Sequence, residues 1–359
     1  MSHRYVAVQW NRFKWTYDAL FALGIAAFLI GFERVLRLQQ RGGEAISEPV
    51  RHMRAYGSCA FLLLTLVLAI GPLARLSPRW KPLLYNRRHL GVAMCGIALL
   101  HADAVLGFYH AYSNIPKSVS LLRFDSAFTG ASGPFQLAGA LALVILLLMA
   151  STSHDFWQKF LGARVWKGLH MLVYLAYALA VVHVAFGALQ IEAHPAYAIV
   201  VGGSALGVCS LHLWAALKSN APDRAAPVWV ELDGTRYLDA GLASEIPENR
   251  ARPLCVPGAE RIAIVRHAGQ VSALHGVCAH QGGPLYEGKV IDGCLTCPWH
   301  GWQYRPEDGC APPPFVERIP TYRLRLKAGR VLVDPRPLPP GTAVPAVPVH
   351  SESEHDSAA

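Results

Sequence analysis

The sequence predicts a membrane-embedded, all-α bundle of six helices followed by a small all-β domain. Nearly all the long apolar runs fall within residues 16–217, whereas residues 227–335 have the composition of a soluble domain. Only 16% of the 359 residues are charged, against about 25% in an ordinary soluble domain. From residue 228 onward, apolar and polar residues alternate in short runs, as they do in strands. The two halves therefore belong in different solvents, lipid and water.

Six apolar segments are long enough to cross a bilayer, whose core takes about 20 helical residues. The first is the weakest, because Asp18 and Glu33 bracket only fourteen apolar residues. It follows a basic N-terminus without a small-residue cleavage site, so we expect an uncleaved helix rather than a signal peptide. The predicted spans are residues 15–36, 55–75, 89–112, 133–151, 166–189 and 195–217.

The distribution of Lys and Arg predicts the orientation, since cytoplasmic loops are enriched in these residues. With the N-terminus inside, the inner segments hold 13 of them and the outer loops hold 7, although the first outer loop is itself basic. We therefore expect a multi-pass protein of the cell (inner) membrane, embedded in lipid, with its C-terminal half in the cytoplasm. The same clusters account for the net charge of +9, so no nucleic-acid partner is expected.

Four segments follow along the chain. Residues 1–217 form the membrane domain, residues 218–226 a short polar linker, and residues 227–335 the β domain. The remaining residues, 336–359, are rich in Pro and then in Ser, Glu and His, a composition typical of disorder.

Two histidines lie deep within the predicted spans, where ionisable side chains are costly and so indicate function. With a rise of about 1.5 Å per residue, His101 lies roughly 20 Å beyond Arg88, and His183 lies roughly 24 Å beyond Lys167. The third and fifth spans run in the same direction, so the two imidazoles are level. Two imidazoles facing each other across a helical bundle are the ligands that a six-coordinate b-type haem needs.

A third histidine, His170, lies near the cytoplasmic end of the fifth span. It stands about 220° around an ideal helix from His183, so the two share a face only if the helix is distorted. Otherwise His170 serves a second haem, for which His89 has the right depth but stands at the membrane edge. The number of haems, one or two, stays open.

The stretches R-R-H-L-G-V-A-M-C-G-I-A-L-L-H (87–101) and W-K-G-L-H-M-L-V-Y-L-A-Y-A-L-A-V-V-H (166–183) resemble the ferric-reductase-like transmembrane domain. Within it, they are similar to the haem-binding membrane subunit of bacterial methionine-sulfoxide reductase systems. The resemblance covers about residues 15–217 and implies that the three histidines are haem-associated. Superfamily members with two complete bis-histidine haems carry another histidine deep in the third span, whereas here the matching position is near Asn114.

The β half contains two short motifs that each offer one thiolate and one imidazole. They are C-A-H-Q-G-G-P-L, with Cys278 and His280, and C-P-W-H-G-W, with Cys297 and His300. Zinc also takes two Cys and two His, but zinc fingers usually pair Cys with Cys and His with His. In a Rieske [2Fe–2S] centre one iron takes two Cys and the other two His, which a pair of mixed loops supplies.

These loops, with the preceding V-R-H-A-G-Q-V-S-A-L, resemble the Rieske family over residues 227–335. The resemblance implies a [2Fe–2S] cluster, with the two thiolates on a buried iron and the two imidazoles on an outer iron. High-potential respiratory members bridge the two loops with a disulfide, for which this sequence has no cysteines in place. A ferredoxin-type centre with few hydrogen bonds to its sulfurs and a low potential is therefore expected.

A [2Fe–2S] cluster and haem b on one chain predict transmembrane electron transfer. A cytosolic donor would reduce the cluster, the cluster would reduce the haem, and the haem would reduce an acceptor in or across the membrane. The sequence has no G-x-G-x-x-G nucleotide motif, so the donor is expected to be a separate cytosolic flavoprotein or ferredoxin. Two alternatives stay open: a metalloreductase that reduces ferric iron or oxygen directly at the outer haem, and a non-catalytic redox sensor.

Overall fold

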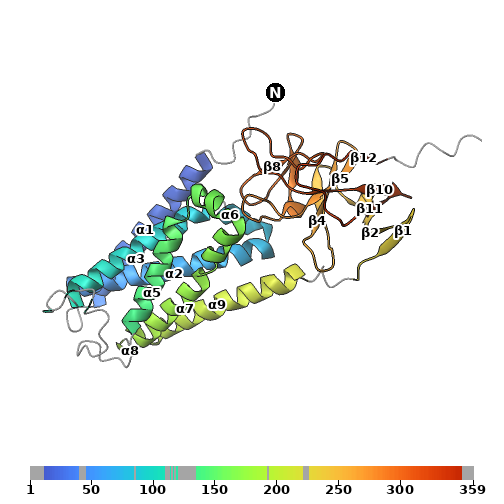
Figure 1. The fold of residues 1–359 in the computed structure, drawn as a ribbon. Helices are drawn as coiled ribbons and strands as arrows, with labels where there is room; N and C mark the ends of the chain where they lie inside the picture. Colours follow the sequence, from blue (N-terminus) through green and yellow to red (C-terminus); the bar gives the residue numbers. More distant parts are fainter. Residues whose placement is uncertain are drawn as a thin grey trace, which may run out of the picture. The chain divides into compact units, whose positions relative to one another are not determined.

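The chain forms two compact units, one over Trp10–Ala216 and one that begins at Leu217. Their elements are drawn in Figure 1, where the first unit is helical and the second is built of strands. The computed structural model describes residues 12–39, 46–84, 86–109, 135–191, 194–220 and 226–349, with Asn114, Pro116 and Val119. The predicted fold class, a helical membrane half followed by a β half, is confirmed.

The described part of the helical unit consists mainly of long apolar helices. Its elements are α1 (Arg12–Gln39), α2 (Glu48–Leu76), the 3-10 helix η2 (Pro78–Leu84), α3 (Arg87–Tyr109), α5 (Phe135–Ser151), α6 (Asp155–His170), α7 (Val173–Phe186), α8 (Ala188–Ile191) and α9 (Pro195–Asn220).

Five helical segments in the described part of the chain are long and apolar enough to cross a membrane. They are Lys14–Leu38, Glu48–Leu76, Arg87–Phe108, Val165–Gln190 and Pro195–Ser219. The sixth predicted span corresponds to α5, a shorter apolar helix of 17 residues, which is at the lower limit for crossing a bilayer. The six-helix prediction is therefore broadly consistent with the structure. The last positions of the third predicted span and the first two of the fourth lie outside the described residues.

The apolar helices turn much of their surface outward, as helices surrounded by lipid do. In α1, Leu20, Leu23 and Ile30 are all more than half exposed. The inner faces of α2, α3, α5, α7 and α9 meet in one apolar core around Leu64 and Ala176. In this core α2 packs along α3, and α5 packs along α7, so residues of α2 and α5 lie beside the two helices that carry the deep histidines.

The segment that carries His170 and His183 is interrupted. Helix α6 ends at His170, the next two residues form a turn, and α7 begins at Val173. A further break precedes it at Gly162, whose φ of 74° is not helical. The two histidines therefore do not lie on one ideal helix, and the 220° separation expected for such a helix does not apply.

The β unit contains two sheets. One has the order β1 (Trp229–Leu232), β2 (Thr235–Leu242), β11 (Arg330–Val333), β10 (Leu324–Lys327). The other has the order β12 (Val347–Pro348), β5 (Gln270–His275), β4 (Ile262–His267), β3 (Arg250–Leu254), β6 (Lys289–Ile291), β7 (Cys294–Thr296), β8 (Gln303–Tyr304), with β9 (Thr321–Tyr322) also paired to β5. All of these pairings are antiparallel.

The central strands β4 and β5 divide the apolar residues of the β unit between two cores. Ile262 and Ile264 enter one core with residues of the first sheet. Ala263 and Val265 alternate to the other face and join Cys278, Cys297 and the residues around them. This period of two is what a strand buried on both faces requires, and it provides the wall on which the two cysteine loops rest.

The expectation of a disordered tail from residue 336 is wrong for residues 336–349. Within this segment β12 pairs with β5, and the Val344 N–H donates to the carbonyl of Glu307 at 2.8 Å. The Thr321 hydroxyl donates to the carbonyl of Thr342 at 2.8 Å. Main-chain hydrogen bonds along an edge strand stabilise even a Pro-rich segment, because Pro is tolerated at sheet edges. Residues 350–359 lie outside the described part of the chain.

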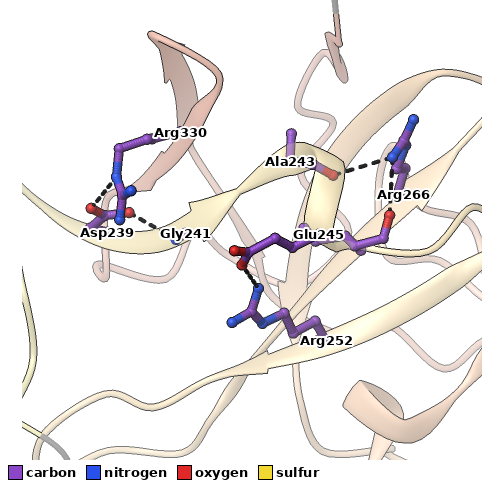
Figure 2. Close-up of polar contacts among 8 residues, drawn as sticks. Asp239, Gly241, Ala243, Glu245, Arg252, Arg266 and Arg330 are labelled. Atoms are coloured by element: carbon purple, nitrogen blue, oxygen red, sulfur yellow. Dashed lines mark hydrogen bonds and ion pairs between the residues drawn. The ribbon is translucent and has the colours of Figure 1, made fainter.

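One carboxylate stabilises the first sheet where its register shifts. Figure 2 shows Asp239 of β2 between the Arg330 side chain and the Gly241 main chain. Its side chain, only 5% exposed, accepts from the Arg330 Nε at 2.7 Å and from the Gly241 N–H at 2.8 Å. The irregularity in the pairing of β11 with β2 lies between Arg330 and Leu332, so these bonds satisfy groups that the ladder leaves out.

Replacing Asp239 with Ala should destabilise the β unit. The change leaves the Gly241 N–H without its acceptor, which lowers the free energy of unfolding by about 1–2 kcal/mol. Loss of the ion pair with the exposed Arg330 contributes little to this decrease. Urea unfolding of the purified chain would measure the change. The control is Glu245→Gln, which should leave the free energy of unfolding unchanged within error, because Glu245 is exposed and forms an ion pair with the exposed Arg252 (Figure 2). Equal unfolding midpoints for D239A and the unsubstituted chain would contradict this role.

Candidate functional site

The two cysteine loops have the same main-chain hydrogen bonds. In the first loop, the Cys278 N–H donates to the Gly283 carbonyl at 2.9 Å, and the Cys278 carbonyl accepts from the Gly282 N–H at 2.8 Å. In the second, the Cys297 N–H donates to the Trp302 carbonyl at 2.7 Å, and its carbonyl accepts from the Gly301 N–H at 3.0 Å. The loops are therefore twin turns with identical sequence offsets.

One glycine in each turn has a backbone conformation that other residues rarely adopt. Gly282 and Gly301 both have a φ of 73°, in the left-handed region where a Cβ is unfavourable. They occupy equivalent positions, four residues after Cys278 and Cys297. The motifs C-A-H-Q-G-G and C-P-W-H-G-W thus fold alike because each has a glycine where the turn reverses.

The turns bring the two thiols together in the core. Cys278 is 2% exposed and Cys297 is 3% exposed. The Cys297 thiol donates a hydrogen bond that lowers the pKa of Cys278 to about 7, although burial acts in the opposite direction. The same bond raises the pKa of Cys297 well above its ordinary value. A buried pair in which one thiol ionises readily is suited to bind a metal, because the thiolate is the ligand.

The two imidazoles lie side by side at the other end of the loops. The ring centroids of His280 and His300 are 5.3 Å apart and their planes are nearly perpendicular, at 85°. Both side chains are half-buried, in contrast to the buried thiols. A metal–imidazole bond of about 2 Å would place two rings on one tetrahedral metal with centroids roughly 5 Å apart, so this separation fits one metal held by both.

The four donors are thus sorted into a thiol pair and an imidazole pair. Across the described ranges no three His, Cys, Asp or Glu side chains are grouped as a mononuclear metal site would need. A two-iron centre needs only two protein ligands on each iron, with inorganic sulfide completing the coordination. The residues therefore fit a [2Fe–2S] cluster better than a single zinc ion.

A tyrosine that the sequence analysis did not single out lies against the thiols. The Tyr304 hydroxyl is 3.4 Å from Cys278 Sγ and accepts from the Ala279 N–H at 3.0 Å. Burial and the neighbouring Cys278 raise the pKa of Tyr304 far above its ordinary value, so the phenol keeps its proton and donates to the sulfur. This contact gives Cys278 a hydrogen bond, where few to the sulfurs were expected from the sequence.

In the helical unit the structure brings His101 and His183 together. Their ring centroids are 6.1 Å apart at an interplanar angle of 77°. Metal–imidazole bonds of about 2 Å would place two rings on opposite sides of one iron with centroids roughly 6 Å apart. This spacing is longer than that of the His280–His300 pair, as it must be for opposed rather than adjacent ligands. The pair fits a bis-histidine haem.

Both rings are held by main-chain carbonyls. His101 Nδ1 lies 3.0 Å from the Met53 carbonyl of α2, and His183 Nδ1 lies 2.8 Å from the Phe135 carbonyl of α5. A carbonyl oxygen only accepts, so each Nδ1 carries the proton. The neutral rings therefore present Nε2 as a lone pair, the tautomer in which histidines bind metals.

Two glycines make room for these rings. A Cβ on Gly57 of α2 would lie 2.9 Å from the His101 ring, and a Cβ on Gly139 of α5 would lie 2.6 Å from His183 Nδ1. Both distances are shorter than side chains tolerate. The helices next to α3 and α7 thus have glycine where an imidazole lies against their main chain.

His170 is built in the same way but is not part of this pair. Its Nδ1 donates to the Trp166 carbonyl at 3.0 Å, and its ring stacks on Trp166 at 3.9 Å. Its Nε2 is buried without a hydrogen-bond partner among the described residues. His89, which has a similar depth but stands at the membrane edge, has its Nδ1 2.7 Å from Asp18 and 3.0 Å from Asn86.

Family models match both units. The model described as a ferric reductase like transmembrane component matches residues 56–181, and the model described as a Rieske [2Fe-2S] domain matches residues 237–323. The ferredoxin component of the alkene monooxygenase system of Xanthobacter autotrophicus is 32% identical over 110 residues, which are 30% of this chain and 89% of that protein.

The chain is a fusion of a ferric-reductase-like transmembrane domain and a Rieske [2Fe–2S] domain. The fusion is also similar to the heme-binding subunit MsrQ of the protein-methionine-sulfoxide reductase of Herminiimonas arsenicoxydans, with 35% identity over 130 residues. The match covers 36% of this chain and 55% of MsrQ. A solved complex of reduced oxygenase and oxidized ferredoxin in carbazole 1,9a-dioxygenase is 26% identical, with a TM-score of 0.26 over 27% of this chain and 91% of that chain.

These matches establish a coarse description of the fusion. It is a multi-pass membrane protein, its Rieske domain carries a [2Fe–2S] cluster, and its role is in electron transfer. The resemblances expected from the sequence are confirmed. The assignment of individual ligands, to the cluster and to haem, stays a prediction.

Replacing Tyr304 with Phe should lower the midpoint potential of the cluster and leave the cluster bound. In the unsubstituted chain this hydrogen bond stabilises the reduced, more negative state of the cluster. Hydrogen bonds to charged groups are worth about 1.5–3 kcal/mol, or roughly 65–130 mV for one electron. A redox titration followed by EPR measures the shift. The control is Tyr322→Phe, since Tyr322 is a buried tyrosine of the other core and contacts His275. An unchanged potential in Y304F would contradict this role.

Replacing Gly139 with Ala should reduce the amount of haem bound. The new methyl group would displace the His183 ring from its position. The haem content of the purified chain, measured as a pyridine haemochrome per protein, should fall several-fold. The control is Gly96→Ala in α3, because a Cβ there meets nothing within 4 Å. Equal haem content in both variants would show that the His183 ring is not confined by Gly139.

Proposed function

We propose that the fusion carries single electrons across the membrane, from a cytosolic donor through the Rieske [2Fe–2S] cluster and haem b to an acceptor in or beyond the membrane. The observation that supports the proposal is that one chain holds two sets of potential metal ligands, and the members of each set lie close together. One is the pair of twin cysteine loops, and the other is the facing pair His101 and His183. Both groups, when bound, accept and release one electron at a time.

The Rieske residues have distinct roles in this proposal. Cys278 and Cys297 hold the buried iron, and their burial excludes water from it. His280 and His300, which are half-buried, hold the outer iron and provide the edge at which an electron enters or leaves. Tyr304 donates its proton toward Cys278 Sγ and favours the reduced state.

In the membrane domain, His101 and His183 hold the haem. The likeness to a relative named as a heme-binding subunit supports haem as the bound group, and the Nδ1 contacts of both rings support binding through Nε2. The carbonyls of Met53 and Phe135 keep the rings neutral and fixed in orientation. His170, with a buried Nε2 and the same kind of carbonyl contact, is the residue through which a second haem would bind.

The remaining parts of the proposal follow from charge and from the motifs that are present. The excess of Lys and Arg in the inner segments supports a location in the inner membrane with the Rieske domain in the cytoplasm. The donor is a flavoprotein or a ferredoxin in the cytosol, since both deliver single electrons. The acceptor lies in the membrane or on its far side.

Replacing His101 or His183 with Ala should abolish b-type haem and leave the cluster intact. The two variants should lose nearly all of the b-type optical band, while the EPR signal of the reduced Rieske cluster persists at full intensity. The control is His212→Ala, because His212 of α9 contacts the Leu68 carbonyl and has no part in the proposed pair. The measurement is an optical and EPR spectrum of each purified, dithionite-reduced variant.

Electron flow can be tested on the same variants. A chemically reduced small ferredoxin should reduce cluster and haem in the unsubstituted chain, and only the cluster in H101A and H183A. A b-type band retained in both variants would exclude this pair as the ligands. Rapid reduction of a ferric chelate by the purified chain alone would favour the metalloreductase alternative.

A further inference from the structure

Trp302, the residue before strand β8, links the two cysteine loops. The Trp302 carbonyl accepts the N–H of Cys297 at 2.7 Å. Its ring lies flat on the imidazole of His280, with centroids 4.2 Å apart and an interplanar angle of only 4°. Phe315 contacts Trp302 at a centroid distance of 4.4 Å. Trp302 is thus joined to the second loop by its main chain and to the first by its side chain.

The indole of Trp302 has a buried N–H that no described residue accepts. The residue is only 2% exposed, and its Nε1 has no hydrogen-bond partner in the described part of the chain. The indole nitrogen is a donor only. A buried donor left without an acceptor costs about 1–3 kcal/mol, and such groups are rare in folded proteins. The described part of the chain therefore leaves this donor to an acceptor of another kind, such as a bound group.

The polypeptide around Trp302 holds the ligands of a group rich in acceptors. Trp302 shares a core with Cys278 and Cys297 and covers His280. A [2Fe–2S] cluster held by these residues brings sulfide and thiolate sulfurs, which carry negative charge that grows on reduction. Hydrogen bonds to such sulfurs tune the potential of iron–sulfur centres.

We propose that the Trp302 indole N–H donates a hydrogen bond to a sulfur of the [2Fe–2S] cluster, and that Trp302 is a positioning residue that orients His280 and favours the reduced state. The inference rests on the proposed cluster ligands. It assigns two separable tasks to one side chain: the ring orients the imidazole by stacking, and the N–H stabilises charge on the cluster.

The test uses the full-length chain, purified with its cofactors and labelled with ¹⁵N in the tryptophan indole. After reduction with dithionite, HYSCORE and proton ENDOR spectra of the cluster signal should show a coupled indole ¹⁵N and a proton that exchanges in D₂O. The β unit contains two other tryptophans, Trp229 and Trp299. The variants W229F and W299F should keep both couplings, and W302F should lose them.

The potential gives a second readout. The substitution Trp302→Phe keeps an aromatic ring over His280 but removes the donor. It should lower the midpoint potential by the equivalent of about a tenfold change in the reduction equilibrium, which is about 59 mV for one electron. W302L removes ring and donor together and should also alter the EPR line shape, because His280 loses its stacking partner.

The outcomes separate this inference from the proposed function. If the chain shows no Rieske EPR signal, the proposed function fails. If the signal is present but no indole coupling is found, or the coupling is lost in W299F, the inference about Trp302 is overturned and a buried water satisfies its N–H. If W302F fails to bind the cluster, the test rests on the labelled unsubstituted chain and on W229F and W299F. An indole coupling that is present in all three supports Trp302 as the donor.

Discussion

The structure depends on main-chain hydrogen bonds that orient the histidines and cysteines proposed as metal ligands. In the membrane domain, carbonyls of Met53 and Phe135 fix the tautomer and the orientation of the two facing histidines. In the Rieske domain, the N–H and carbonyl of each cysteine close identical turns. Ligands that are already oriented need not reorganise when the charge of the bound group changes, and such preorganisation is what a functional site requires.

This constraint explains why glycine recurs beside the ligands. Gly57 and Gly139 lie where a helix backbone approaches an imidazole, and Gly283 lies where a Cβ would be 2.5 Å from Cys297 Sγ. In each case the space of a missing Cβ is taken by the side chain of a proposed ligand. The two domains fold in different solvents and share no architecture, but both admit their ligands in this way.

Much of the fold was predictable because the strongest signals are local. Apolar runs mark the membrane helices, and alternation marks long strands such as β4 and β5. Short strands were missed, since β8 has only two residues and too few positions to show a period. The folded segment 336–349 was missed because its composition resembles disorder, whereas its order comes from pairing with β5 and from contacts made far away in the sequence.

The residues of the candidate site likewise fall into those that the sequence could predict and those that it could not. Motif spacing was enough to propose the four loop residues Cys278, His280, Cys297 and His300. The rise of an α-helix was enough to predict that His101 and His183 lie at a similar depth in the membrane. Both predictions depend on local regularity. The carbonyl partners, the glycines and Tyr304 could not be proposed, since they come from other elements brought near by packing. His170 shows the limit of the helical estimate, because a two-residue turn separates α6 from α7 directly after it and the angle calculated for one ideal helix is not exact there.

The most direct test of the account is an anaerobic redox titration of the purified, unsubstituted chain, followed by EPR and optical spectroscopy together with metal analysis. The account predicts a Rieske [2Fe–2S] signal and a b-type haem band in the same preparation, each titrating as a one-electron centre, with iron as the bound metal. A colourless chain, or one that carries zinc in place of iron, would contradict it.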